Sequence, residues 1–233
     1  MTAPGSALRR PQTWATVILL VALATLLPRI ASPTSVVIAV LGAASLLIVA
    51  HSAGLSMSEL GIARADLGRG ARWAAVIIAI VSVGYVILAL IPATRSVVFG
   101  DNRVPTSTSA ILVQVFVVIP LQTVLLEEVA FRGVLWGLVR HHHRALTATI
   151  WSSLLFGLWH VLPALGFAGA RTDVAGEVGT EGIVLGTVVL TMLAGVVLCE
   201  LRRRSGSLLA PMGLHWATNA IGLLAAAAVA GHL

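Results

Sequence analysis

Long apolar stretches alternate with short polar ones along almost the whole chain. Each apolar stretch holds roughly the 20 residues that a helix needs to cross the hydrocarbon core of a bilayer. The stretches lie at residues 13–31, 34–52, 73–92, 109–139, 145–166, 182–201 and 207–231. This pattern predicts an all-α fold, a polytopic transmembrane bundle of about seven helices.

The polar stretches between the predicted helices differ in character. Residues 93–108 and 166–181 are rich in Gly, Thr and charged residues, and we expect irregular loops there. Residues 55–72 keep several apolar positions, which suits a loop with one turn of helix lying on the membrane surface. Residues 140–144, Arg-His-His-His-Arg, resemble a metal-binding tract. Because this turn is short and polar, we expect it to be a solvated loop.

Composition agrees with a membrane location. Of the 233 residues, 58% are hydrophobic and only 10% are charged, whereas soluble domains carry about 25% charged residues. We therefore expect an integral membrane protein. All the basic residues are arginine, and an all-arginine, alanine-rich composition indicates a bacterial gene of high GC content. The expected location is the bacterial plasma membrane.

The arginines are distributed unevenly between the two sides of the predicted bundle. The side with more of them carries Arg9, Arg10, Arg64, Arg69, Arg72, Arg140, Arg144, Arg202, Arg203 and Arg204. The loops on the opposite side hold only Arg29, Arg95, Arg103 and Arg171. Because arginine accumulates on the cytoplasmic side of membrane proteins, we expect a cytoplasmic N-terminus and an external C-terminus. The net charge of +6 then reflects topology, with anionic lipid as the counter-charge, and does not indicate a nucleic-acid partner.

Six polar side chains interrupt three of the last four predicted helices at mid-depth. They are Glu127, Glu128, Arg132, His160, His215 and Asn219. A charged side chain at the centre of a bilayer costs roughly 2.5–3.5 kcal/mol even on the most lenient scale. Such a cost is tolerated where the groups pair inside a bundle or line a wet cavity, so we expect these residues to form the functional site.

The depths of these residues in the membrane agree with one another. At 1.5 Å per residue from the cytoplasmic helix end, Glu128 lies roughly 18 Å deep and His160 roughly 22 Å deep. On the same count His215 and Asn219 lie roughly 14 and 20 Å deep. Three separate helices therefore place polar groups in one layer of the bundle.

Helical spacing separates the residues into two groups. Glu128 and Arg132 are four residues apart, in the order that favours an ion pair, so we expect them to neutralise each other. Glu127 projects about 100° away from Glu128 and is free to face another helix. His215 and Asn219, also four residues apart, are expected to project together.

Each of the three site helices also carries a proline close to its polar group. These are Pro120, Pro163 and Pro211. A proline inside a helix removes a backbone hydrogen bond and bends the helix. Bent helices around a polar layer would make room for the water that a hydrolase inside a membrane requires.

Two chemistries fit this set of residues. A carboxylate beside a histidine, here Glu127 and His160, can activate a water as a general base. His215 and Asn219 can then donate hydrogen bonds to the oxyanion of a tetrahedral intermediate. Alternatively, Glu127, His160 and His215 match a three-ligand catalytic zinc site with an open fourth position. Both give hydrolysis of an acyl bond, and no HExxH or GxSxG motif points to another hydrolase class.

The polar residues form three motifs in a fixed order along the chain. They are Glu127-Glu128-x-x-x-Arg132, Phe156-x-x-x-His160 and His215-x-x-x-Asn219. Together they closely resemble the CPBP family of intramembrane endopeptidases, which comprises the type II CAAX prenyl endopeptidases and bacteriocin-processing (Abi) enzymes. The resemblance covers roughly residues 109–231.

The resemblance implies an intramembrane endopeptidase. It implies that Glu127 and His160 activate the attacking water, that His215 and Asn219 stabilise the oxyanion, and that Glu128 and Arg132 support them. The favoured mechanism requires no cofactor, and zinc is the alternative. We expect an N-terminal three-helix region, 1–108, and a catalytic bundle, 109–233, in one structural unit.

The expected partners are the lipid bilayer and a membrane-tethered protein or peptide substrate, while the sequence indicates no oligomeric state. A prenylated substrate is not expected in a bacterium. Two other functions compete. Buried Glu and His chains also relay protons in transporters, although the outer halves of the site helices hold few polar groups (Gln114, Gln122). A non-catalytic, bacteriocin-immunity-like protein is the other alternative.

Overall fold

The chain folds into a bundle of helices in a computed structural model that describes residues 11–99, 104–170 and 172–233. This part of the chain contains no strand, and seven of its helical segments are long and apolar enough to cross a membrane. The spans are Pro11–Arg29, Thr34–Ser52, Met57–Leu90, Thr108–Arg140, Ala145–Ala170, Ala175–Ser205 and Leu209–Val229. The predicted all-α bundle of seven spans is confirmed. Arg9, Arg10, Arg103 and Arg171, which the arginine count used, lie outside the described residues.

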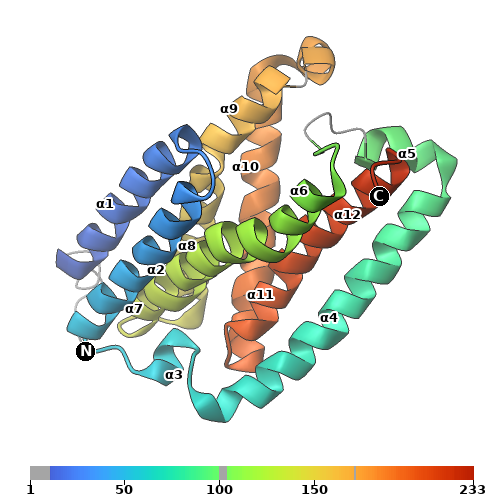
Figure 1. Ribbon diagram of the computed structural model, residues 1–233. Coiled ribbons are helices and arrows are strands. Elements are labelled where there is room, and N and C mark those ends of the chain that lie inside the picture. Colours follow the sequence, from blue (N-terminus) through green and yellow to red (C-terminus); the bar gives the residue numbers. More distant parts are fainter. Residues whose placement is uncertain (1–10, 100–103, 171) are drawn as a thin grey trace.

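The first three spans lie along two sides of the bundle (Figure 1). Their elements are α1 (Pro11–Leu26), the 3₁₀ turn η1 (Leu27–Arg29), α2 (Thr34–Ser52), α3 (Met57–Leu60), α4 (Arg64–Leu90) and α5 (Pro92–Phe99). α1 packs on α2, whereas α4 lies apart from both and packs on the last span.

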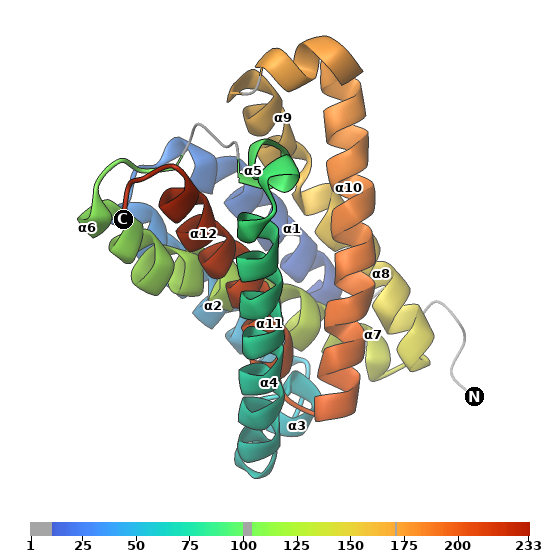
Figure 2. The same ribbon diagram turned by 90° about the vertical axis from the view of Figure 1, so that its right-hand side faces the viewer.

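The remaining four spans lie on both sides of α4 in the view of Figure 2. Their elements are α6 (Thr108–Val113), η2 (Gln114–Leu125), η3 (Glu128–Leu135), α7 (Trp136–Arg140), α8 (Ala145–Trp159), α9 (Val161–Ala170), α10 (Thr172–Ser205), α11 (Leu209–Trp216), η4 (Ala217–Ile221) and α12 (Gly222–Val229). α2 packs on η2 and η3, and α10 packs on α8, α9 and α11. The N-terminal spans therefore contact the C-terminal ones directly.

The predicted loops are more helical than their composition indicates. Residues 92–99 form α5, where Phe99 is buried and its ring lies 6.2 Å from that of Tyr85. Residues 166–170 continue α9, and α10 already begins at Thr172. The irregularity expected there is concentrated at Gly179, whose φ of 77° breaks the regular path of α10. The single turn of helix expected within 55–72 is α3.

Three stretches near the polar layer wind as π-helix: η2, η3 and η4. Wide helical turns of this kind occur frequently at functional sites. Pro120 lies within η2, as the prediction of a disturbed helix requires. The fifth span breaks at His160, between α8 and α9. The predicted bend at Pro211 is wrong, because α11 begins at Leu209 and the first turn of a helix has no amide partner to lose.

One end of the bundle is held together by arginine. Arg202, at the end of α10, is 4% exposed and donates to the backbone oxygens of Ser58 (2.9 Å) and Glu59 (3.0 Å) in α3. Gly61 ends α3 with a φ of 78°, and a side chain there would collide with the Arg202 guanidinium. Only glycine meets both demands, so this residue fixes the α3–α4 connection against the end of α10.

Candidate active site

The buried ion pair expected from the spacing of Glu128 and Arg132 is present. Nη1 of Arg132 lies 3.1 Å from Oε1 of Glu128, and both side chains are 0% exposed. The two residues lie on the π-helical segment η3, in the middle of the fourth span. A fully buried pair of opposite charges avoids the cost of either charge alone in the bilayer.

The Arg132 guanidinium is also held by an aromatic ring. Its central carbon lies 3.9 Å from the centroid of the Phe156 ring, within the range of a cation–π interaction. The Nε and Nη2 atoms of Arg132 have no hydrogen-bond acceptor among the described residues. Phe156 therefore covers the part of the cation that Glu128 leaves unpaired.

Glu128 makes a second contact, with the last span. Nδ1 of His215 lies 2.8 Å from the same Oε1 atom that binds Arg132. Since an ionised carboxylate only accepts hydrogen bonds, this nitrogen donates to it. The pair thus becomes a chain of three residues that fixes the orientation of His215. No local pattern in the sequence predicts this contact, because it joins residues of two spans that are 87 positions apart.

Glu127 points away from Glu128, as helical geometry predicts, and faces two other residues. Its Oε1 accepts a hydrogen bond of 3.0 Å from the indole Nε1 of Trp159. Its Oε2 has no hydrogen-bond partner among the described residues and lies 3.8 Å from Nε2 of His215. One oxygen of the carboxylate is therefore fixed and the other is available.

His160 occupies the break between α8 and α9. Its Nδ1 lies 2.7 Å from the backbone oxygen of Phe156. Because a carbonyl oxygen can only accept, Nδ1 carries a proton, and Nε2 of the neutral ring keeps its lone pair. The imidazole also packs edge-on against the Phe156 ring, with the centroids 4.6 Å apart. These contacts leave His160 with a basic nitrogen in a defined direction.

A cavity of about 790 Å³ brings three of the six predicted residues together. Glu127, His160 and Asn219 lie on its wall, from three different spans. His215 does not line this cavity, since it is 7% exposed and lies between Glu127 and Glu128. Of the two residues of this motif, Asn219 lines the cavity, whereas His215 packs against the two glutamates.

The rest of the cavity wall comes partly from the N-terminal spans, for which the sequence predicts no role in the site. Leu23 and Leu27 of the first span and Tyr85 of α4 line the same cavity. So do Gln114 and Gln122 of the fourth span, and the Gln122 side chain accepts a hydrogen bond of 2.9 Å from Ser35 in α2. No sequence pattern marks Leu23 or Leu27 among the many apolar residues of the chain, and only the fold shows where they lie.

The site residues do not fit the zinc arrangement. No three His, Cys, Asp or Glu side chains in the described part of the chain lie close enough together to hold a metal ion. Glu127, His160 and His215 therefore do not present three converging ligands.

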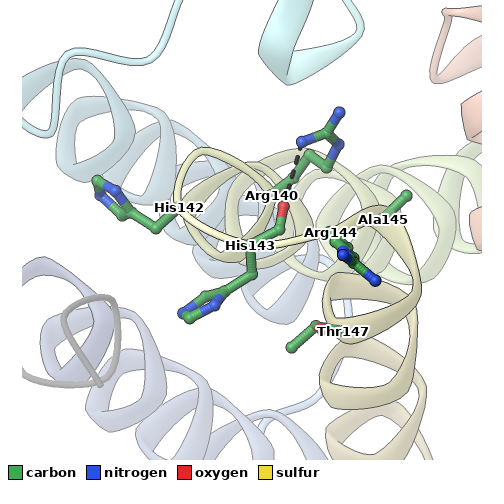
Figure 3. A pocket seen from close by; sticks show the side chains of 6 residues that line it. All are labelled: Arg140, His142, His143, Arg144, Ala145 and Thr147. Carbon is green, nitrogen blue, oxygen red and sulfur yellow. Dashed lines mark hydrogen bonds between the residues drawn. The ribbon is translucent and has the colours of Figure 1, made fainter. Parts of the chain in front are cut away.

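The histidine-rich turn at residues 140–144 lies at the arginine-rich end, away from this cavity. Arg140 donates to the backbone oxygen of His143 (3.1 Å), and His141 contacts Glu59 at 2.6 Å. Figure 3 shows the side chains of His142 and Arg144 on opposite sides of the turn, so they do not converge on one point. The turn has the solvated character expected from the sequence.

Comparison with known proteins identifies the segment that carries the site. Residues 108–221 match a family described as type II CAAX prenyl endopeptidase Rce1-like. The matched segment runs from the start of α6 to the end of η4 and includes all six polar residues of the predicted site. No curated protein and no solved structure matches the chain.

Proposed function

We infer that this chain, an integral membrane protein whose residues 108–221 form an Rce1-like domain, hydrolyses peptide bonds inside the membrane. The resemblance found in the three motifs is confirmed by the family match, and at the family level it corresponds to a CAAX-type intramembrane endopeptidase. The substrate is a membrane-associated protein or peptide. The membrane is the bacterial plasma membrane, with the arginine-rich end of the bundle in the cytoplasm.

One observation carries the proposal. A carboxylate, an imidazole and a carboxamide, those of Glu127, His160 and Asn219, line one cavity in a bundle whose spans are otherwise apolar. One Glu127 oxygen is fixed by Trp159, and the other accepts no hydrogen bond from the described residues. A fixed carboxylate with an available oxygen, on the same cavity wall as a basic histidine, is an arrangement that suits general-base activation of water.

The reaction assigns a step to each of these residues. A water in the cavity attacks the carbonyl carbon of the scissile peptide bond while Glu127, assisted by Nε2 of His160, takes its proton. The oxyanion that forms accepts a hydrogen bond from the amide of Asn219. The stored proton then passes to the leaving nitrogen, the carbon–nitrogen bond breaks, and a carboxylate and an amine leave.

The supporting residues do not contact the substrate in this proposal, and they act by positioning Glu127. They are His215, Glu128 and Arg132. Arg132 and the imidazole of His215 both contact Glu128, and this leaves Nε2 of His215 directed at Glu127. We assign to His215 the positioning of Glu127 and a role in holding its proton. This differs from the oxyanion role that the motif implies, because His215 does not line the cavity.

The proposed hydrolysis is metal-free. The three residues that a zinc mechanism would use do not converge, as described above. A proton-coupled transporter is less well supported, because a relay needs a polar path through the whole bundle. Between Arg132 and Arg140 the fourth span holds only apolar residues and glycine, all of them buried.

The test is proteolysis by the purified protein in lipid nanodiscs. Membrane-anchored peptides are incubated with wild type and with His160→Ala, and new termini are identified by mass spectrometry. We expect wild type to cleave with or without a chelator and His160→Ala to lose at least 100-fold in rate. His51→Ala, at an exposed helix end, is the matched control and retains full activity.

Three results would contradict the proposal. Full activity in His160→Ala would remove that residue from the mechanism. Activity lost to chelator and restored by stoichiometric zinc would establish the metal mechanism instead. No cleavage of any peptide by a folded wild-type protein would favour the non-catalytic alternative.

A further inference from the structure

The cavity extends from the polar layer toward only one end of the bundle. Gln114 lines it thirteen residues before Glu127, roughly 20 Å along the helix axis. Val104 and Pro105, which precede the fourth span, also line it, and so does Ala226 near the end of the last span. These residues belong to the end of the bundle where α5, the start of α6 and the C-terminus lie together (Figure 1).

The other end of the bundle is closed below the polar layer. Every residue from Leu126 to Val139 is buried. Phe131 and Leu135 belong to one continuous apolar core with Leu208, from the start of the last span, and with Leu60 of α3. Closely packed side chains of this kind leave no room for water, so the site cannot be filled from that end.

The distribution of arginines indicates which side of the membrane the closed end faces. Within the described residues, the closed end carries Arg64, Arg69, Arg72, Arg140, Arg144, Arg202, Arg203 and Arg204, whereas the open end carries only Arg29 and Arg95. Because arginine marks the cytoplasmic side, the cavity opens toward the extracytoplasmic side.

The cavity wall also limits what can enter. Glu127 is the only Asp, Glu or Arg residue among the described residues that line it. The other polar groups are neutral, such as the carboxamides of Gln114 and Gln122 and the hydroxyl of Thr123. Without an arginine among the described residues of the wall, the free carboxylate of a chain end would have no partner there. An uncharged internal segment of polypeptide, with its backbone amides exposed, fits this wall better.

We propose that this enzyme takes its substrates from the extracytoplasmic side of the membrane, as uncharged segments that flank a membrane anchor. That the molecule entering the cavity is a substrate rests on the proposed function. The side of entry rests only on the cavity, the closed end and the distribution of arginines. The substrates are then proteins or peptides whose cleavage site emerges on the outer face. A cytoplasmic chain end would not reach Glu127.

The side of entry can be measured by labelling single cysteines. The chain has one cysteine, the buried Cys199, so Cys199→Ala provides a background without reactive thiols. Gln114→Cys and Thr123→Cys place thiols at the outer end and deep in the cavity, and His143→Cys places one at the arginine-rich turn (Figure 3). Each variant is expressed in bacteria and treated with a charged, membrane-impermeant thiosulfonate, before and after the membrane is permeabilised.

We expect the two cavity cysteines to react in intact spheroplasts, and His143→Cys to react only after permeabilisation, with at least a tenfold difference in each labelling ratio. Cavity cysteines that react only after permeabilisation, or not at all, would overturn the inference. So would a His143→Cys variant that reacts from outside. Labelling does not require catalysis, so outside labelling of a protein that cleaves nothing would overturn the proposed function and leave the side of entry standing.

Discussion

Replacing Arg132 by methionine tests the central support of the site. The substitution removes a fully buried cation and leaves the Glu128 carboxylate, which is also 0% exposed, without it. Breaking a buried pair by removing one partner costs roughly 3–5 kcal/mol. His215 can still donate to Glu128, so we expect the lower end, about 3 kcal/mol.

The double variant Glu128→Gln with Arg132→Met removes both charges together. Its carboxamide oxygen can still accept the hydrogen bond from His215, and methionine fills part of the space beside Phe156. Because no charge is left unpaired, we expect the double variant to be more stable than Arg132→Met alone, by at least about 1 kcal/mol. Unfolding is measured by titration with sodium dodecyl sulfate in mixed micelles, followed by circular dichroism.

A matched pair at the surface gives the control. Glu200 and Arg204 have the same spacing of four residues and a contact of 2.6 Å, but their side chains are 38% and 61% exposed. Arg204→Met should destabilise the protein far less than Arg132→Met, because exposed ion pairs contribute little. The role of the buried pair would be contradicted if Arg132→Met lowered the free energy of unfolding no more than Arg204→Met. It would also be contradicted if the effect of the double variant equalled the sum of the effects of Glu128→Gln and Arg132→Met measured singly.

Two further predictions concern the neighbours of the site. Trp159→Phe removes the hydrogen bond to Glu127 and keeps an aromatic ring. We expect kcat to fall about tenfold, the equivalent of about 1.4 kcal/mol for one hydrogen bond to a charged group, while KM stays constant. An unchanged kcat would show that the indole does not position the carboxylate. Gly157→Ala places a methyl carbon 2.8 Å from the backbone oxygen of Val188 on α10, so the free energy of unfolding should fall by about 1–3 kcal/mol. Gly186→Ala, in the same helix α10 with no atom of another element nearby, should keep or slightly raise stability, because alanine favours helix over glycine. Equal effects of the two substitutions would mean that α8 and α10 do not pack as described.

The spans and the polar layer could be predicted from the sequence because both follow from local chemistry. Apolar length determines where a helix can cross a bilayer, and a spacing of four residues determines that Glu128 and Arg132 meet. The irregular loops expected at 93–108 and 166–181 are observed only in part. Residues 104–107 are irregular, whereas residues 93–99 belong to α5, 166–170 to α9 and 172–181 to α10, in which Gly179 provides a break.

The contacts between spans could not be predicted in this way. The hydrogen bond from His215 to Glu128 and the one from Trp159 to Glu127 depend on how three helices rotate against one another. The lining of the cavity depends on the same rotations, since Asn219 lines it and His215, four residues earlier, does not.

The most direct test of the account is the rate of peptide cleavage by Glu127→Gln. This variant keeps an oxygen that can accept from Trp159 but loses the basic carboxylate. We predict a loss of about 100-fold to 10,000-fold in kcat, the usual contribution of a general base, while Glu181→Gln, on the exposed part of α10, keeps the wild-type rate. A Glu127→Gln enzyme that cleaves within tenfold of wild type would show that this carboxylate does not activate the water.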